Sequence, residues 1–244
     1  MKILVIGDSC DDIFVYGKCD RICPEAPVPV FTPKETKKNG GMARNVYNNI
    51  KSLVNENVEV FLVTNSNLMS KTRYVDYKTN QMLLRIDDND KADSIGVDLF
   101  NLKDYDAVVI SDYDKGFLTQ EDIQFIIEAY PLTFIDTKKQ IGDWIRGASF
   151  IKINETEYKK NSTYLDSLLN SQLIVTLGER GVKHDDITYT PDEVVDALDL
   201  SGAGDTFLAG LVTNYIDDLD IIKSILFAQE CAGKAVTKKG VAVI

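Results

Sequence analysis

The stretch DLSGAGDTFLAG, Asp199 to Gly210, places a glycine turn and a carboxylate directly before a strongly apolar segment. Residues 202–204 carry almost no side chain, so their backbone N–H groups can converge on a phosphate at the positive end of a helix dipole. Asp205 falls in the first turn of that helix, where the dipole stabilises the anionic form that a proton acceptor needs. The stretch therefore predicts an anion site with a base beside it, followed by a helix over residues 206–215.

A tight loop whose aspartate only caps the helix could have the same sequence, because a single glycine-rich motif is weak evidence for a phosphate site. Two better-known phosphate motifs are excluded. The chain has no GxxxxGK[ST] sequence, and Phe207 stands where GxGxxG would need its third glycine. The other motifs of the chain are needed to distinguish a helix cap from an anion-binding site.

Composition indicates an ordinary globular protein. With 244 residues and 44% hydrophobic content, we expect one domain over residues 1–244, with a small appendage. The net charge of −11 argues against binding to nucleic acid or to an anionic membrane. An acidic protein that binds a phosphorylated ligand must gather its few cations locally and use a metal ion. No apolar stretch reaches the ~20 residues of a membrane span and no secretory signal is present, so we expect a cytoplasmic protein.

Cysteine and histidine chemistry is not expected. Cys10, Cys19, Cys23 and Cys231 are too few and too scattered for a disulfide framework or a zinc site, which predicts free thiols. His184 is the only histidine and lies in a predicted hairpin. A surface or strand role fits it better than a catalytic relay.

Short β-rich runs alternate with helical stretches. The runs are KILVIG, VEVFLV, DAVVIS, LTFID, SFIKI and LIVTLG, and helices are expected at 42–53, 94–102 and 120–130. This alternation predicts an α/β protein with a parallel sheet covered by helices. Ligands of open α/β sheets bind at the carboxyl ends of the strands. Polar or glycine endings occur there at Asp8, Asp112, Asp136, Asn154 and Gly178. Each alone could be a helix cap, but together they favour a site.

Residues 13–33 and 72–86 break the alternation. The first segment is rich in proline and β-branched residues, which suits an extended excursion. The second resembles a hairpin with Thr79 and Asn80 near its turn. Together they predict a small β lid that would keep water from a phosphoryl transfer, and their exposed edges favour a homodimer. A pair of ordinary surface ribbons is the alternative.

Several motifs occur in a characteristic order: Gly7-Asp8 with Asp12, GGMARN (40–45), NETE (154–157), TLGERG (176–181) and GAGD (202–205). With them the chain resembles the ribokinase-like (PfkB) sugar kinases over nearly its whole length. The resemblance implies a three-layer αβα sandwich with a mostly parallel central sheet and a small β lid. Within the family the chain is most similar to kinases of D-glycero-β-D-manno-heptose 7-phosphate at C1, through residues 15–30, LLRID (83–87), SDYDKG (111–116) and IDTK (135–138).

The resemblance implies ATP and Mg²⁺ as cofactors and assigns roles at the transfer end. Asp205 would take the proton of the attacking sugar hydroxyl. The transferring phosphoryl group would be held by the N–H groups of Gly202, Ala203 and Gly204. Asn154 and Glu157, three apart on a helical turn, would organise Mg²⁺ through its waters. The nucleotide would be bordered by Thr176, Gly178 and Gly181, with Gln229 near the adenine.

At the sugar end, the family's hydroxyl-binding positions are matched by Asp12, Gly40, Gly41 and Asn45, and Asp112 and Asp136 lie at the same predicted edge. Carboxylates and amides suit a polyol because each serves several hydroxyls. A phosphate already on the substrate would need cations, for which the candidates are Arg21, Lys115 and Lys138. Solvated surface charges are the alternative for these three residues.

The chain also departs from the family. After residues 58–65 it goes almost directly to the hairpin, where relatives insert a helix and a strand, and its end omits a terminal helix. Thr137 replaces the proline of IDPK, and no nucleotidyltransferase domain follows, which predicts a kinase-only form. We expect an ATP-dependent sugar-phosphate kinase. The alternatives are another sugar or nucleoside kinase, and a noncatalytic sensor, against which the retained Asp205 argues.

Overall fold

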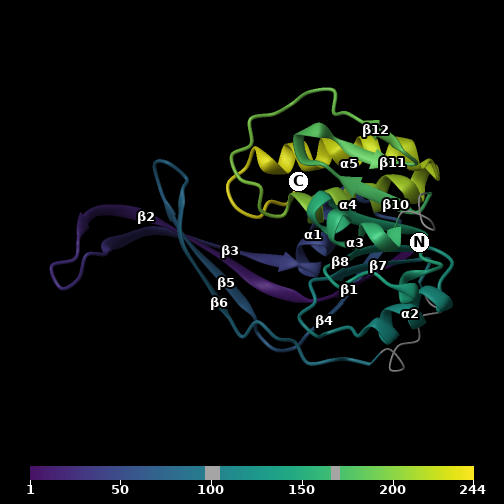
Figure 1. The fold of residues 1–244 in the computed structure, drawn as a ribbon, viewed down its shortest axis with the longest axis horizontal. Coiled ribbons are helices and arrows are strands. Elements are labelled where there is room, and N and C mark those ends of the chain that lie inside the picture. Colours follow the sequence, from purple (N-terminus) through teal and green to yellow (C-terminus); the bar gives the residue numbers. More distant parts are fainter. Residues whose placement is uncertain (97–104, 166–170) are drawn as a thin grey trace.

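The computed structural model describes residues 1–96, 105–165 and 171–244. In this part of the chain the main sheet has eight strands (Figure 1). They are β1 (Lys2–Gly7), β4 (Glu59–Thr64), β7 (Ala107–Asp112), β8 (Thr133–Thr137), β9 (Phe150–Asn154), β10 (Leu173–Thr176), β11 (Val182–His184) and β12 (Ile187–Tyr189). The order is β12-β11-β10-β9-β8-β7-β1-β4; the pairs β10–β11 and β11–β12 are antiparallel, and the remaining neighbours are parallel. The α/β class and the mostly parallel sheet are confirmed.

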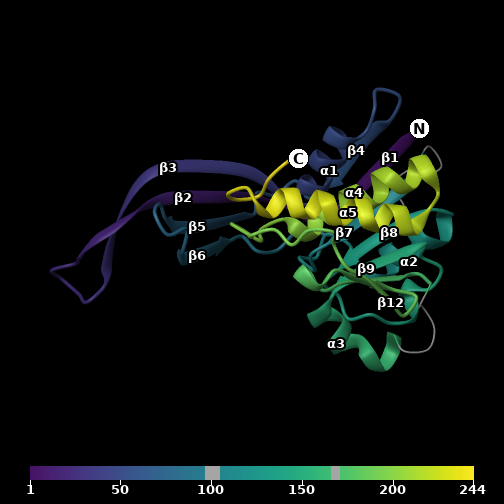
Figure 2. The same ribbon diagram turned by 90° about the horizontal axis from the view of Figure 1, so that it is seen from above.

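Helices cover both faces of the main sheet (Figure 2). They are α1 (Ala43–Leu53), α2 (Gln120–Ala129), α3 (Glu155–Leu165), α4 (Ala203–Asp218) and α5 (Ile221–Val236). Successive strand residues point to opposite faces. Thus Ile3 and Val5 pack with α1, α4 and α5, whereas Leu4 and Ile6 pack in the cluster that contains α2. The result is three layers, with the strand ends carrying polar residues at one edge.

A second sheet projects from this body (Figure 1). Its order is β3-β2-β5-β6, from strands β2 (Ser9–Ile22), β3 (Pro29–Met42), β5 (Ser70–Asp76) and β6 (Met82–Asp88). The segments expected at 13–33 and 72–86 fall within it, and Thr79 and Asn80 lie in the turn between β5 and β6. The first excursion is longer than expected because β2 and β3 keep pairing back to Ser9 and Met42.

The expected helices are found where the chain is described. The helix of residues 42–53 begins at Ala43, and α2 begins after a capping box between Thr119 and Asp122. The helix expected at 94–102 falls mainly on residues 97–102, which lie outside the described residues. Two 3₁₀ turns, Asp143–Ile145 and Gly178–Arg180, were not expected from the sequence.

His184 has a strand role. It lies in the β11–β12 hairpin, is 3% exposed, and its Nδ1 is 2.9 Å from the carbonyl oxygen of Leu173. The four cysteines are free, as expected. None of the described helices combines the length and apolarity needed to cross a membrane.

The close approach of α4 to α5 depends on Gly210. A Cβ there would lie 3.0 Å from both the Cα of Ala228 and the Sγ of Cys231, so Gly210→Val should lower the free energy of unfolding by about 1–3 kcal/mol. In the matched variant Gly233→Ala, the nearest atom is 4.0 Å away, and the better helix propensity should raise stability by up to about 1 kcal/mol. Urea denaturation measures both. Equal effects would contradict this packing.

Candidate active site

The GAGD turn positions the start of α4. Gly202 precedes the helix with a left-handed φ of 80°, and a Cβ at this position would lie 2.8 Å from the side-chain nitrogen of Asn45. A Cβ on Gly204 would lie 2.8 Å from Nζ of Lys152. The N–H of Ala203 donates to the carbonyl of Leu200 at 3.3 Å. That donor is therefore engaged within the turn, and Gly204 is the glycine that faces a cation.

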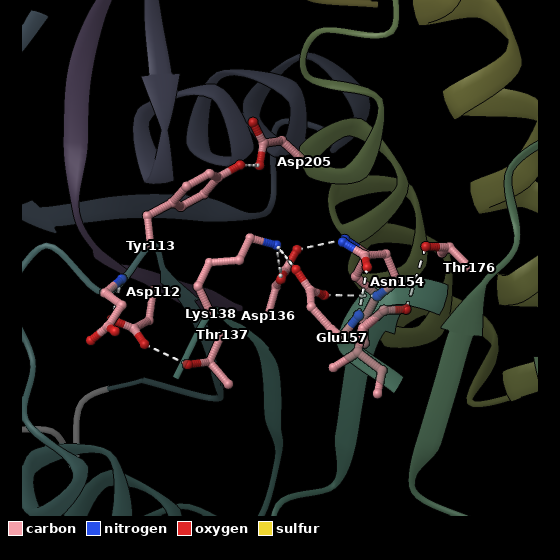
Figure 3. Close-up of polar contacts among 12 residues, drawn as sticks. Asp112, Tyr113, Asp136, Thr137, Lys138, Asn154, Glu157, Thr176 and Asp205 are labelled. Atoms are coloured by element: carbon pink, nitrogen blue, oxygen red, sulfur yellow. Dashed lines mark hydrogen bonds and ion pairs between the residues drawn. The ribbon is translucent and has the colours of Figure 1, made fainter. Parts of the chain in front are cut away.

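Asp205 is buried at this helix start, with only 4% exposure (Figure 3). Tyr113 donates its hydroxyl to Oδ1 at 2.6 Å, and Asn45 donates its amide to Oδ2 at 3.0 Å. Burial raises the pKa of Asp205 to about 6, against the two hydrogen bonds, which lower it. A carboxyl group with this pKa is ionised at neutral pH and is a better proton acceptor than an ordinary aspartate.

Tyr113 is held for this contact by the end of β1. Asp8, which is fully buried, accepts the backbone N–H of Tyr113 at 2.7 Å. Burial and then the charge of Asp205 raise the pKa of Tyr113 well above its usual range, so the hydroxyl keeps its proton and donates it. Nζ of Lys71 lies 5.5 Å from the ring centroid, and Nζ of Lys138 lies 5.4 Å from it.

A chain of alternating charges runs along the strand ends (Figure 3). Lys152 of β9 is 3% exposed, and its Nζ is 2.6 Å from Asp136 Oδ2. Lys138 Nζ is 3.3 Å from Asp136 Oδ1 and 2.6 Å from Glu157 Oε1. Burial acts to raise the pKa of Asp136, but the two lysines outweigh it and hold that pKa below its usual value. Lys152 is thereby paired with Asp136 and lies beside Gly204.

Asn154 and Glu157 bind each other. The backbone N–H of Glu157 donates to Asn154 Oδ1 at 2.9 Å, and the N–H of Asn154 donates to Glu157 Oε2 at 2.8 Å. The pair therefore caps the start of α3, while Glu157 Oε1 faces Lys138. Over the described ranges, no group of three or more His, Cys, Asp or Glu side chains is arranged to hold a metal ion. A magnesium ion here would depend on phosphate oxygens and water for most of its ligands.

The predicted nucleotide residues lie beside this pair. Thr176 ends β10 directly opposite Asn154. Gly178 has a φ of 64° and open space where a Cβ would be, whereas a Cβ on Gly181 would lie 2.1 Å from the carbonyl oxygen of Tyr189. Gln229 of α5 donates to that same carbonyl at 3.0 Å. Gln229 thus ties α5 to β12, and Gly178 is the position that leaves room for a ligand.

At the sugar end the structure brings Asp12 and Gly41 together, whereas Asn45 lies against Asp205. A Cβ on Gly41 would lie 2.1 Å from Asp12 Oδ2, and Asn45 binds Asp205. Gly40 faces Arg44 instead, since a Cβ there would lie 2.4 Å from its Cδ. Asp12 is 5% exposed and forms an ion pair with Arg73.

Three predicted substrate residues have other partners or lie elsewhere. Asp112 accepts from Thr137 and, at 2.9 Å, from Lys139, and it points away from Asp205 because successive residues at the strand end face opposite ways (Figure 3). Arg21 is exposed on the projecting β2–β3 hairpin, since continued pairing of these strands carries it outward. Lys115 forms an ion pair with Asp90.

Sequence reasoning missed Tyr113, Lys152 and Lys71. The signal for Lys152 was a lysine inside the apolar strand FIKIN, where a buried cation needs a partner or a function. Tyr113 stands within SDYDKG, a motif from which only Asp112 and Lys115 were predicted as site residues.

Known proteins share this sequence and fold. The pattern of the pfkB family carbohydrate kinases matches residues 119–243. The bifunctional protein HldE of a Nitratiruptor species is 32% identical over 291 residues, covering 99% of this chain and 62% of HldE. The chain thus spans less than two thirds of that relative's length.

Solved structures give the fold. Ribokinase from Thermotoga maritima superposes with a TM-score of 0.72 at 16% identity, covering 98% of this chain and 94% of that one. Arabidopsis thaliana ribokinase complexed with ribose and ATP gives a TM-score of 0.67 at 14% identity, with 98% and 93% covered. The ribokinase-like fold is confirmed. Together with the family match, this places the chain in the pfkB family of carbohydrate kinases, phosphotransferases that act on an alcohol group.

Proposed function

We propose that this protein uses ATP and Mg²⁺ to phosphorylate the C1 hydroxyl of D-glycero-β-D-manno-heptose 7-phosphate. The observation that carries the proposal is the buried Asp205 at the start of α4, with a pKa raised to about 6 and a buried lysine across Gly204. A base and a phosphoryl-binding cation side by side fit transfer to a hydroxyl. The HldE relative and the resemblance of LLRID and SDYDKG to heptose kinases support the substrate.

Each residue of the site has a task in this reaction. Asp205 accepts the proton of the sugar hydroxyl, and Tyr113 and Asn45 fix the carboxylate for it. The charge that develops on the transferring phosphoryl group is met by Lys152 and the N–H of Gly204. Asp12 and Gly41 line the sugar end.

The donor set also suits a hydrated magnesium ion. Glu157 is the carboxylate that would order its waters, with Asn154 beside it, once Lys138 turns toward the phosphates. The ion supplies charge neutralisation between the phosphates of ATP. Gly178, open where a Cβ would be, borders the nucleotide. We propose residues 1–244 as one kinase domain, with the second sheet as its lid.

The proposal is tested by ADP release from ATP and Mg²⁺ across a panel of sugars and sugar phosphates that includes heptose 7-phosphate. We expect turnover on the heptose phosphate, with the new phosphate at C1 by ³¹P NMR. Turnover only on another sugar would keep the kinase and refute the substrate. Binding of ATP or sugar without any turnover would favour a sensor.

Replacing the base separates catalysis from stability. Asp205→Asn should lower turnover by roughly 100-fold or more while ATP still binds. The folded-state pKa of about 6 lies above the ordinary aspartate value of 3.8, so the stability from Asp205 is full at low pH and is lost as pH rises through 6. The free energy of unfolding of the variant, relative to that of the wild type, should therefore rise by about 1 kcal/mol between pH 5 and pH 8. A pH-independent difference in unfolding free energy would contradict the raised pKa.

The cation across Gly204 is tested by Lys152→Met, with the exposed Lys160→Met as matched control. Loss of a preorganised phosphoryl contact should lower kcat by about 100-fold or more, with less effect on the KM for ATP. The variant leaves Asp136 with Lys138 as its remaining ion-pair partner. Circular dichroism checks that the variant is still folded. An unchanged kcat in a folded variant would remove Lys152 from the mechanism.

A further inference from the structure

The second sheet carries a charged face next to the site. Strand register places Asp12 of β2 opposite Lys71 of β5, and Lys71 opposite Asp87 of β6. One step along, Arg73 lies opposite Arg85. Because residues two apart on a strand share a face, all five side chains project from the same side of this sheet.

Most charges near this face have a partner. Arg73 forms an ion pair with Asp12. Arg85 makes two hydrogen bonds of 2.7 Å to Asp87, and Lys115 is paired with Asp90.

Lys71 is the exception. It is only 8% exposed, and within residues 1–96, 105–165 and 171–244 it has no hydrogen bond or ion pair. Burial is the main cause that lowers the pKa of Lys71; Cys10 and Asp12 act to raise that pKa, and the charges of Arg85 and Lys115 act to lower it. Burying an unpaired ammonium costs free energy, so this placement calls for an anionic ligand, in a chain whose net charge is −11.

Lys71 also lies within reach of the reaction centre. Its Nζ is 5.5 Å from the ring centroid of Tyr113, whose hydroxyl binds Asp205. On the other side it neighbours Asp12, at the proposed sugar end. A sugar bound between Asp12 and Asp205 therefore has the ammonium group beside it.

We infer that Lys71 binds a phosphate ester that the sugar substrate already carries. The inference rests on the proposed function and names the residues that would select a sugar phosphate over a free sugar. An ammonium group has three N–H donors and offers a phosphate charge-assisted hydrogen bonds. Of the cations considered from the sequence, Arg21 projects outward, and Lys138 is already neutralised by Asp136 and Glu157.

The test uses Lys71→Met, which keeps the length of the side chain and removes its charge, with Lys71→Arg to restore charge. Lys78→Met is the matched control, because Lys78 is exposed in the β5–β6 turn. Kinetics are measured on heptose 7-phosphate and on the unphosphorylated heptose, and heptose 7-phosphate binding without ATP is measured by calorimetry. Lys71→Met should raise KM and Kd for the phosphate ester by about 10- to 100-fold. It should lower kcat/KM for the free heptose far less, and it should not lower the melting temperature of the ligand-free protein. Lys71→Arg should recover part of the loss.

Three results overturn the inference in distinguishable ways. If the wild type prefers the ester and Lys71→Met keeps that preference, the proposed function stands and Lys71 is not its phosphate ligand. If the wild type phosphorylates only free sugars, both the phosphorylated substrate and the role of Lys71 are refuted, while kinase activity remains. If no sugar is turned over, calorimetry decides: equal binding of the ester by wild type and Lys71→Met refutes the inference.

Discussion

The structure depends on keeping one carboxylate buried at the start of a helix. Asp205 is 4% exposed and receives hydrogen bonds from Tyr113 and Asn45, which come from the end of β7 and from α1. Burial alone would favour the protonated acid, whereas the two donors and the helix dipole favour the anion. The balance leaves a pKa of about 6, so the group is charged at neutral pH and remains basic. The fold converges on this point, because β1 positions Tyr113 through Asp8 and the GAGD turn positions α4.

The cations around Asp205 divide into two kinds. Lys152 and Lys138 belong to a neutralised chain with Asp136 and Glu157 along the strand ends. Lys71 belongs to the second sheet and lacks such a partner in the described ranges. In the proposed reaction, the first kind would support the transferring phosphoryl group, and the second would bind the phosphate that the substrate carries. On the proposed function, an acidic protein would bind two phosphorylated molecules by concentrating a few lysines at one edge of the sheet.

Local sequence pattern predicted much of the fold, because apolar strands alternating with amphipathic helices leave few other arrangements. Local sequence motifs predicted the glycine turn, Asp205 and the strand-end carboxylates. Side-chain direction was not, since Asp112 and Tyr113 are neighbours and only the fold shows that the tyrosine faces the site. Long-range pairing was also hidden: Lys71 meets Tyr113 only through the register of β5 on β2. Lys138 looks like a free cation in the sequence because its partner Glu157 is distant along the chain.

The most direct test of the account is the titration of Asp205 itself, followed by ¹³C NMR of labelled aspartate carboxyl groups and assigned by comparison with Asp205→Asn. The account predicts a pKa of about 6 in the ligand-free protein. It also predicts a higher value in Tyr113→Phe, because the tyrosine hydrogen bond lowers this pKa. A carboxyl group that titrates near 3.8, or one that does not respond to the loss of Tyr113, would contradict the buried-base account.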